Sequence, residues 1–258
     1  AVAKVISCGA GLTIQHIRAG RTKIDYPRII GHEITAEIIE VGKDVANLKV
    51  GDPVTAYYYL TCGNCRWCIG GRETLCDNFL GYVGKSINGG YAEFIKLPAK
   101  NFLKIPNNLD YKKYAAELGV ITDAVATPIK ITKKTRMKSG EVVAIIGAGG
   151  GLGLHMLMAS LWADTKVIAV DISDKKLNVC KKLGAVGTIN PNKIGLTEGL
   201  LELTGGKGAD VIIDFVATHQ TLGDSICSLG KGGRLVILGG GGVAKPITAS
   251  GEWIKSRE

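Results

Sequence analysis

Four cysteines stand close together in a chain that contains only seven. They form a C-x2-C-x2-C-x7-C pattern within the run TCGNCRWCIGGRETLC, at Cys62, Cys65, Cys68 and Cys76. Four thiolates at such spacings can surround one zinc ion tetrahedrally, which leaves no coordination position open for a substrate. The pattern therefore predicts one structural zinc ion per chain.

Disulfide bonds and an iron–sulfur cluster are the alternatives for these cysteines. Disulfides need an oxidising compartment, whereas the sequence shows no signal-peptide pattern and its other cysteines, Cys8, Cys180 and Cys227, stand singly in apolar surroundings. The closely spaced ferredoxin pattern usually ends in Cys-Pro, but Asp77 follows Cys76. These observations favour zinc and a reducing, cytoplasmic environment, and the iron–sulfur alternative stays open.

A glycine-rich loop in the second half of the chain could hold a phosphate. The strand-like run VVAIIG leads directly into GAGGGLG at 147–153, and a helical pattern follows. Without side chains the backbone can approach a pyrophosphate, whose charge then lies at the helix N-terminus. The expected cofactor contacts are Gly147, Gly149, Gly150, Gly151, Leu152 and Gly153.

An acidic residue follows this loop at the distance expected for a ribose contact. Asp171 ends the next strand-like run, TKVIAVD. A carboxylate there can accept hydrogen bonds from the adenosine ribose and repels a 2′-phosphate, which favours NAD over NADP. Lys176, about one helical turn further on, could reach the same ribose.

These residues need elements to position them, and the chain contains two kinds of pattern. Residues 1 to about 120 hold short β-rich runs, such as ITAEIIEVG and YAEFIKLP, broken by Gly and Pro, which indicate a partly antiparallel β domain. The cysteine cluster falls between two such runs and is expected to be a loop excursion. After residues 139–141, strand-like runs near 142–146, 166–170, 187–189, 211–216 and 234–238 alternate with helical segments, which predicts a parallel, doubly wound sheet.

The bulk composition is that of a globular protein of two domains. The 258 residues are 46% hydrophobic and 21% charged, and no apolar run approaches the roughly 18 residues of a membrane span. The formal charge is +9, but the lysines are dispersed and aromatic residues make up only 6%. Nucleic acid is therefore not an expected partner.

Both ends of the chain indicate a fragment of a longer subunit. The sequence begins with Ala1 inside the strand-like run AVAKVIS. It ends soon after the fifth expected strand, whereas a complete dinucleotide-binding fold has six.

Taken in order, these segments resemble the zinc-containing medium-chain dehydrogenases, the alcohol dehydrogenase family. The resemblance is carried by IIGHEITAEIIEVG, KVGDPV, the four-cysteine segment, GGYAEFIKLP, GAGGGLG and the strand before Asp171. It implies an α/β fold, with a GroES-like catalytic domain over 1–125, a zinc lobe near 60–80, and an incomplete NAD-binding Rossmann domain over 126–258. It further implies a small alcohol or carbonyl substrate and a homo-oligomer at full length.

The resemblance also implies a second, catalytic zinc, but its ligand positions are only partly kept. The GHE motif supplies His32 and Glu33, and Asp123 falls at a ligand position before the second domain. The first-segment cysteine falls at Gly11, which has no ligand atom, with Cys8 as a register-shifted alternative. The aspartate that orients the histidine falls at Ile14.

The family's proton path is better kept. Thr13 and His16 fall where the family has a hydroxyl and a histidine that carry a proton to solvent, and an imidazole suits such a relay. The predicted activity is NAD-dependent hydride transfer between an alcohol and a carbonyl, with a degenerate catalytic zinc site. Two alternatives remain: a structural-zinc-only enzyme for enoyl or cyclic hydroxyacyl thioesters, and a non-catalytic NAD-binding subunit.

Overall fold

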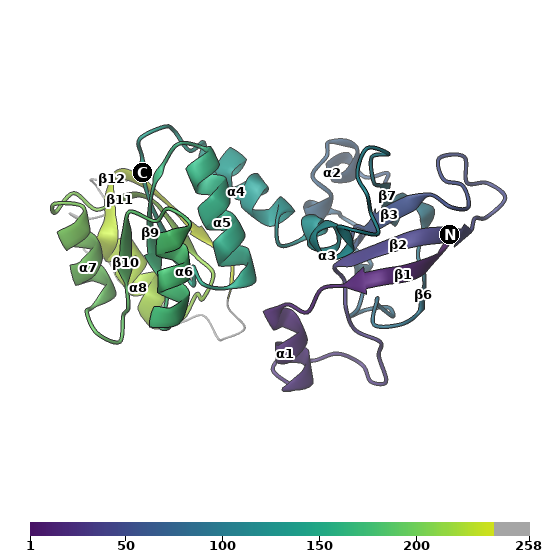
Figure 1. Ribbon diagram of the computed structural model, residues 1–258, viewed down its shortest axis with the longest axis horizontal. Helices are drawn as coiled ribbons and strands as arrows, with labels where there is room; N and C mark the ends of the chain where they lie inside the picture. The colour runs from purple at the N-terminus through teal and green to yellow at the C-terminus, as the bar shows by residue number, and fades with distance from the viewer. Residues whose placement is uncertain (240–258) are drawn as a thin grey trace. The chain divides into compact units, whose positions relative to one another are not determined.

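The chain folds into two compact units, Ala1–Asp123 and a unit that begins at Ala124. The computed structural model describes residues 1–239, so the part of the expected second domain at 240–258 lies outside the described residues. Figure 1 shows a β-rich first unit and a second unit in which helices flank a sheet. Within residues 1–239, no helix is both long enough and apolar enough to cross a membrane.

The first unit is built on a five-stranded antiparallel sheet with the order β6-β1-β2-β3-β7. Its strands are β1 (Val2–Cys8), β2 (Ile34–Glu40), β3 (Pro53–Ala56), β6 (Phe94–Lys96) and β7 (Phe102–Lys104). Alternating side chains of these strands face a buried core that includes Ala36, Ile38 and Val54. The antiparallel β domain expected from the sequence is confirmed.

Short elements decorate this sheet. Strands β4 (Tyr59–Leu60) and β5 (Gly81–Tyr82) pair with each other. The helices of this unit are α1 (Leu12–Arg18), α2 (Arg66–Ile69) and α3 (Ala115–Gly119). Turns of 3-10 helix cover Glu73–Leu75, Ala99–Asn101 and Val120–Thr122. The cysteine segment is therefore not a plain loop, because α2 and a 3-10 turn lie within it. The apolar segment DPVTAYYYL before it forms two strands, β3 and β4.

The second unit is a parallel sheet with the order β10-β9-β8-β11-β12. Its elements are α4 (Ala126–Thr135), β8 (Val142–Ile146), α5 (Gly151–Trp162), β9 (Lys166–Val170), α6 (Asp174–Lys182), β10 (Gly187–Ile189), α7 (Leu196–Leu203), β11 (Ala209–Asp214), α8 (His219–Ser228) and β12 (Leu229–Ile237). This order matches five positions of the dinucleotide-binding arrangement 3-2-1-4-5-6. The expected α/β fold class is confirmed.

Side-chain alternation explains why both faces of this sheet are covered. Along β8, Val143 and Ile145 pack with side chains of α4, α5 and α6, whereas Ala144 and Ile146 pack with Leu196 and Leu200 of α7. Side chains on both faces of β8 therefore meet an apolar layer, which is why this strand is a continuous hydrophobic run.

Two strand boundaries differ from the expectation. Strand β11 ends at Asp214, not at 216, because the Asp214 Oδ1 atom accepts hydrogen bonds from the N–H groups of Val216 and Ala217 and closes a turn. Strand β12 begins at Leu229, five residues before the expected 234, because the glycine-rich segment pairs with β11 from Ala209 onward. Glycines lower the strand propensity of that segment, so its sequence gave no strand signal.

Candidate functional site

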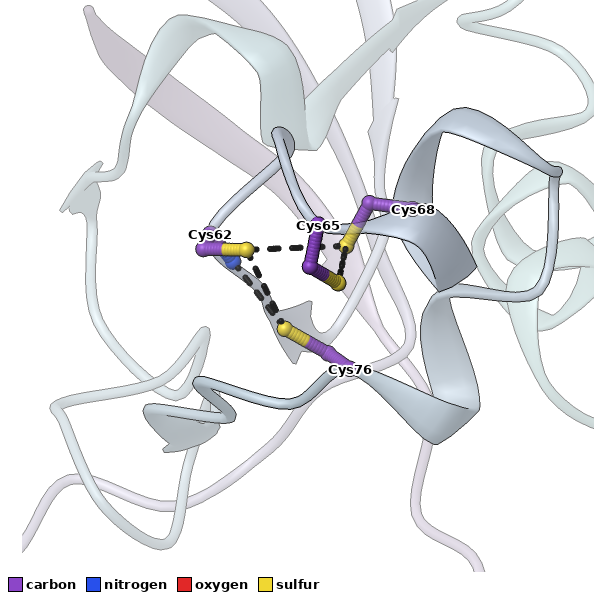
Figure 2. A group of neighbouring side chains, drawn as sticks. All are labelled: Cys62, Cys65, Cys68 and Cys76. Carbon is purple, nitrogen blue, oxygen red and sulfur yellow. Dashed lines mark hydrogen bonds between the residues drawn. The ribbon is translucent and has the colours of Figure 1, made fainter.

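The four cysteines of the lobe converge on one point. Their sulfur atoms all lie within 4.8 Å of one another, and Figure 2 shows the four side chains pointing toward one another. The Cys62 Sγ atom lies 3.9 Å from that of Cys68 and 3.5 Å from that of Cys76, and the Cys65–Cys68 separation is 3.5 Å. Four sulfurs bound tetrahedrally to zinc at 2.3 Å would lie about 3.8 Å apart. The donor set and its spacing fit a single zinc ion.

The same distances exclude the alternatives. All seven cysteines of residues 1–239 are free thiols, and sulfur separations of 3.5–3.9 Å are far beyond a disulfide bond. Sulfurs gathered this closely match one ion better than a multi-iron cluster. The four cysteines form a structural zinc site.

Backbone hydrogen bonds lower the pKa of two of these thiols, which favours the thiolate form that binds a metal. Backbone N–H groups of Asn64 and Cys65 lower the pKa of Cys62 to about 6, and those of Cys68 and Asp77 lower the pKa of Cys65. Burial instead raises the pKa of Cys68 to about 11. A cation among the sulfurs compensates the cost of gathering their negative charge.

A second polar group lies in the first unit, around His32. The His32 Nε2 atom lies 3.2 Å from Oδ2 of Asp123, and the Tyr58 hydroxyl donates to Oδ1 of Asp123 at 3.3 Å. The His32 and Tyr58 rings lie 4.9 Å apart. His32 is only 8% exposed. Burial and then the Asp123 charge raise the pKa of Tyr58, so its hydroxyl stays protonated and can donate.

This group lines a cavity of about 170 Å³. The cavity is lined by Thr13, His32, Tyr58, Tyr59, Tyr82, Val83, Lys85 and Asp123. Of the five expected catalytic residues, Thr13, His32 and Asp123 thus meet at one cavity, while His16 and Glu33 are not among its lining residues. The aromatic residues and Lys85 were missed by the sequence analysis, although the run YYY at 57–59 was visible beside the cysteines.

Glu33 and Cys8 lie on another side of the GHE motif. A Cβ atom at Gly9 would come within 2.5 Å of the Glu33 Oε2 atom, and one at Gly11 within 3.8 Å, so the carboxylate lies against the Gly9 backbone. The Cys8 sulfur would meet a Cβ atom at Gly31 at 2.6 Å. Burial raises the pKa of Cys8 to about 12, which makes it a poor metal ligand at neutral pH. Within residues 1–239, the four lobe cysteines are the only group of three or more potential ligands gathered for a metal.

The glycine loop connects β8 to α5. Gly147 has a φ of +79°, and Gly150 is the N-cap of α5. A Cβ atom at Gly153 would lie 2.2 Å from the Gly147 carbonyl oxygen, so only glycine fits there. A side chain at Gly151 would meet nothing within 4 Å. The loop is a tight turn that leaves the start of the helix open.

Asp171 is bound to this loop. Its Oδ2 atom accepts from the N–H of Gly149 at 3.0 Å, and its Oδ1 atom accepts from the N–H of Ser173 at 3.0 Å. A Cβ atom at Gly149 would lie 2.4 Å from the Lys176 Cβ, so Lys176 packs against the loop. The structure thus brings together the loop, Asp171 and Lys176.

Comparison with known proteins agrees with this architecture. The family profile described as "Alcohol dehydrogenase GroES-like domain" matches residues 1–107, and that described as "Zinc-binding dehydrogenase" matches residues 151–258. An alcohol dehydrogenase of Geobacillus stearothermophilus is 37% identical over 239 residues, which cover 92% of this chain and 68% of the relative. The chain belongs to the zinc-containing medium-chain alcohol dehydrogenase family.

Other members of the family are also similar. An L-threonine 3-dehydrogenase of Streptomyces coelicolor is 32% identical over 243 residues, again covering 92% of this chain and 68% of the relative. The crystal structure of an alcohol dehydrogenase from the archaeon Aeropyrum pernix superimposes with a TM-score of 0.85 at 30% identity, and covers 95% of this chain and 72% of the other. The resemblance stated from the motifs is confirmed, and the protein is an oxidoreductase of alcohol dehydrogenase type.

Proposed function

We propose that the protein interconverts a small alcohol and its carbonyl compound with NAD as the hydride carrier. The observation that carries this proposal is the cavity in which Thr13 meets the His32–Asp123 pair, because a hydroxyl, an imidazole and a carboxylate there can bind and deprotonate a substrate hydroxyl. Relatives named alcohol dehydrogenase and L-threonine 3-dehydrogenase support the same reaction class.

The second unit is proposed to hold the cofactor. The loop Gly147–Gly153 would receive the pyrophosphate at the start of α5, with Gly149, Gly150, Gly151 and Leu152 close to it, and Asp171 and Lys176 would contact the ribose. When bound, NAD accepts the hydride from the substrate's carbinol carbon. Asp171 disfavours a 2′-phosphate because a second negative group would lie against its buried carboxylate.

Proton transfer is assigned to α1. Thr13 lines the cavity, and His16 lies three residues further along the same helix, so the two side chains share one face. The Thr13 hydroxyl takes the proton of the substrate hydroxyl, and His16, which is partly exposed, passes it on towards solvent.

The second metal site is proposed to be degenerate. Two ligand atoms at about 2.1 Å from one tetrahedral zinc would lie about 3.4 Å apart, and the His32–Asp123 separation of 3.2 Å fits that arrangement. A catalytic zinc takes three protein ligands, however, and Gly11 offers none while Glu33 lies against Gly9. A zinc held by His32 and Asp123 would polarise the substrate oxygen. The buried Ile14 cannot orient His32 as an aspartate would.

Steady-state kinetics of the zinc-loaded protein test the reaction. The panel consists of short alcohols and aldehydes, with enoyl thioesters as the competing substrate class, each with NAD and NADP. We expect turnover of alcohols and aldehydes, and a fall of about 100-fold or more in kcat/KM for Thr13→Val, with the exposed His219→Asn as a matched control. Turnover of enoyl thioesters alone would overturn the proposed reaction, and tight NAD binding without any turnover would indicate a decayed site.

Cofactor choice is tested separately at Asp171. The Asp171→Ser variant should lose affinity for NAD and gain relative affinity for NADP, with a change of about 100-fold in the NAD/NADP ratio of kcat/KM. Fluorescence titration with NADH and NADPH measures the same preference without turnover. Asp44→Asn, an exposed change in the first unit, is the control. An unchanged ratio would contradict the assigned role of Asp171.

A further inference from the structure

One positively charged side chain, that of Lys85, lines the candidate active-site cavity. Lys85 lines the cavity beside Tyr59, Tyr82 and Val83. Its Nζ atom lies 5.3 Å from the centre of the Tyr82 ring. Within residues 1–239, no carboxylate lies within ion-pair distance of this ammonium group. The cavity lining therefore includes a positive charge for which residues 1–239 supply no ion-pair partner.

The turn that carries Lys85 is held in one conformation. The N–H groups of Lys85 and Ser86 donate to the Tyr82 carbonyl oxygen, and the Ser86 Oγ atom accepts from the Tyr82 N–H at 3.0 Å. The Gly84 N–H donates to the Ile87 carbonyl oxygen at 3.0 Å. With its backbone fixed, Lys85 can vary only its side chain.

Gly84 brings this turn against the GHE motif. Gly84 has a φ of +78°, and a Cβ atom there would lie 2.7 Å from the Gly31 carbonyl oxygen. The turn therefore packs directly on the backbone that precedes His32. A Cβ atom at position 84 would clash with the Gly31 backbone, so this close packing needs glycine.

The other lining residues restrict which ligand could bind to Lys85. Asp123, the carboxylate of the cavity, already interacts with His32 and accepts from Tyr58. Hydroxyl-bearing side chains, Thr13, Tyr58, Tyr59 and Tyr82, make up half of the lining, and Val83 is its one aliphatic member. Such a lining suits a short polar molecule with one negative charge. A doubly charged phosphate would leave one charge uncompensated near Asp123.

We propose that Lys85 is a specificity residue that binds the carboxylate of a short hydroxy acid or its oxo-acid product. This inference rests on the proposed function and names the substrate class for the same cavity. In the oxidation, the carbinol C–H and O–H bonds break, the hydride reduces NAD, the proton leaves through Thr13, and the carboxylate stays unchanged on Lys85. A charge-assisted hydrogen bond of this kind gives both affinity and orientation.

Two substrates with the same hydroxyl-bearing carbon, one charged and one neutral, test this role. 3-Hydroxybutyrate and its methyl ester share the carbinol carbon, and wild-type kcat/KM should favour the acid. In Lys85→Met the acid/ester ratio of kcat/KM should fall about 10-fold or more, whereas Lys85→Arg should keep most of it. The exposed Lys43→Met removes a positive charge elsewhere and should leave the ratio unchanged. Equal losses in Lys85→Met and Lys43→Met would overturn the proposal, since they would reflect only net charge.

A binding measurement separates this proposal from the proposed reaction. Butyrate and butyramide have no hydroxyl to oxidise, and calorimetry should show that Lys85→Met weakens butyrate binding about 10-fold but not that of butyramide. If butyrate binds in this way and no alcohol is oxidised, the proposed reaction is contradicted but the carboxylate-binding role of Lys85 is supported. If alcohols are oxidised and the acid has no advantage, the role of Lys85 fails. Tighter binding of methylphosphonate than of butyrate would overturn the carboxylate assignment.

Discussion

The Nε2 atom of His32 lies 3.2 Å from the Oδ2 atom of Asp123, although 91 residues separate them in the sequence. His32 precedes β2, and Asp123 follows the 3-10 turn Val120–Thr122 at the end of the first unit. The packing of α3 and this turn beside the antiparallel sheet brings the two side chains together at the cavity.

The first prediction concerns this pair. His32→Asn and Asp123→Asn should each lower kcat/KM for alcohol oxidation about 100-fold. Because the two side chains act as a unit, the double variant should be little worse than either single one. Steady-state kinetics measure the effect, with thermal unfolding to show that the variants fold and His219→Asn as a control. Losses that multiply in the double variant would show that the residues act independently.

The second prediction concerns the zinc lobe. The wild-type protein should contain about one zinc per chain, because four thiolates fill one site and the second site lacks a third ligand. Cys62→Ser should lower the zinc content to about zero and lower the unfolding temperature, since structural zinc contributes directly to folding. Cys227→Ser, at an exposed cysteine far along the chain, should keep both. Elemental analysis decides the question, and about two zinc ions per chain would contradict the degenerate second site.

The third prediction uses two glycines of one loop. Gly153→Ala places a Cβ atom 2.2 Å from the Gly147 carbonyl oxygen, which should lower the free energy of unfolding by about 1–3 kcal/mol. Gly151→Ala meets nothing within 4 Å at the first residue of α5. It should raise that free energy by about 0.5–1 kcal/mol, because alanine is the better helix former. Urea unfolding without cofactor measures both changes, and equal effects would show that the turn has room for a side chain.

The fourth prediction concerns alkaline pH. Burial raises the pKa of Cys8 from 9.0 to about 12, and that of Tyr57 from 10.0 to about 12. The unfolded chain loses the Cys8 proton above about pH 9 and the Tyr57 proton above about pH 10, whereas the folded protein keeps both up to about pH 12. The stabilisation is therefore complete below pH 9 and is lost as the pH rises towards 12, by up to about 1.4 kcal/mol per pH unit for Cys8.

Urea unfolding at several pH values tests this dependence, with zinc kept saturating. Cys8→Ala should flatten the fall in stability above pH 9, whereas the exposed Cys227→Ala should leave it unchanged. Parallel profiles for wild type and Cys8→Ala would mean that the Cys8 thiol does not stay protonated in the folded protein.

Several features could be predicted from the sequence because they depend on local spacing. The zinc lobe needs only fifteen consecutive residues, Cys62 to Cys76, so chain connectivity alone keeps its ligands close. The turn between β8 and α5 needs glycines at fixed offsets, and β8, β9 and β10 lie at the expected positions, 142–146, 166–170 and 187–189. In each case a short segment contains the whole requirement.

The cavity, in contrast, was decided by tertiary structure. It gathers side chains from α1, the GHE motif, the tyrosine run, the turn at Lys85 and Asp123, and no spacing along the chain relates these segments. The GHE motif predicted both His32 and Glu33 as catalytic residues. Only His32 lines the cavity, because Glu33 lies against Gly9. The sequence alone therefore determined which ligands the zinc lobe has, and packing of distant segments determined which side chains meet a substrate.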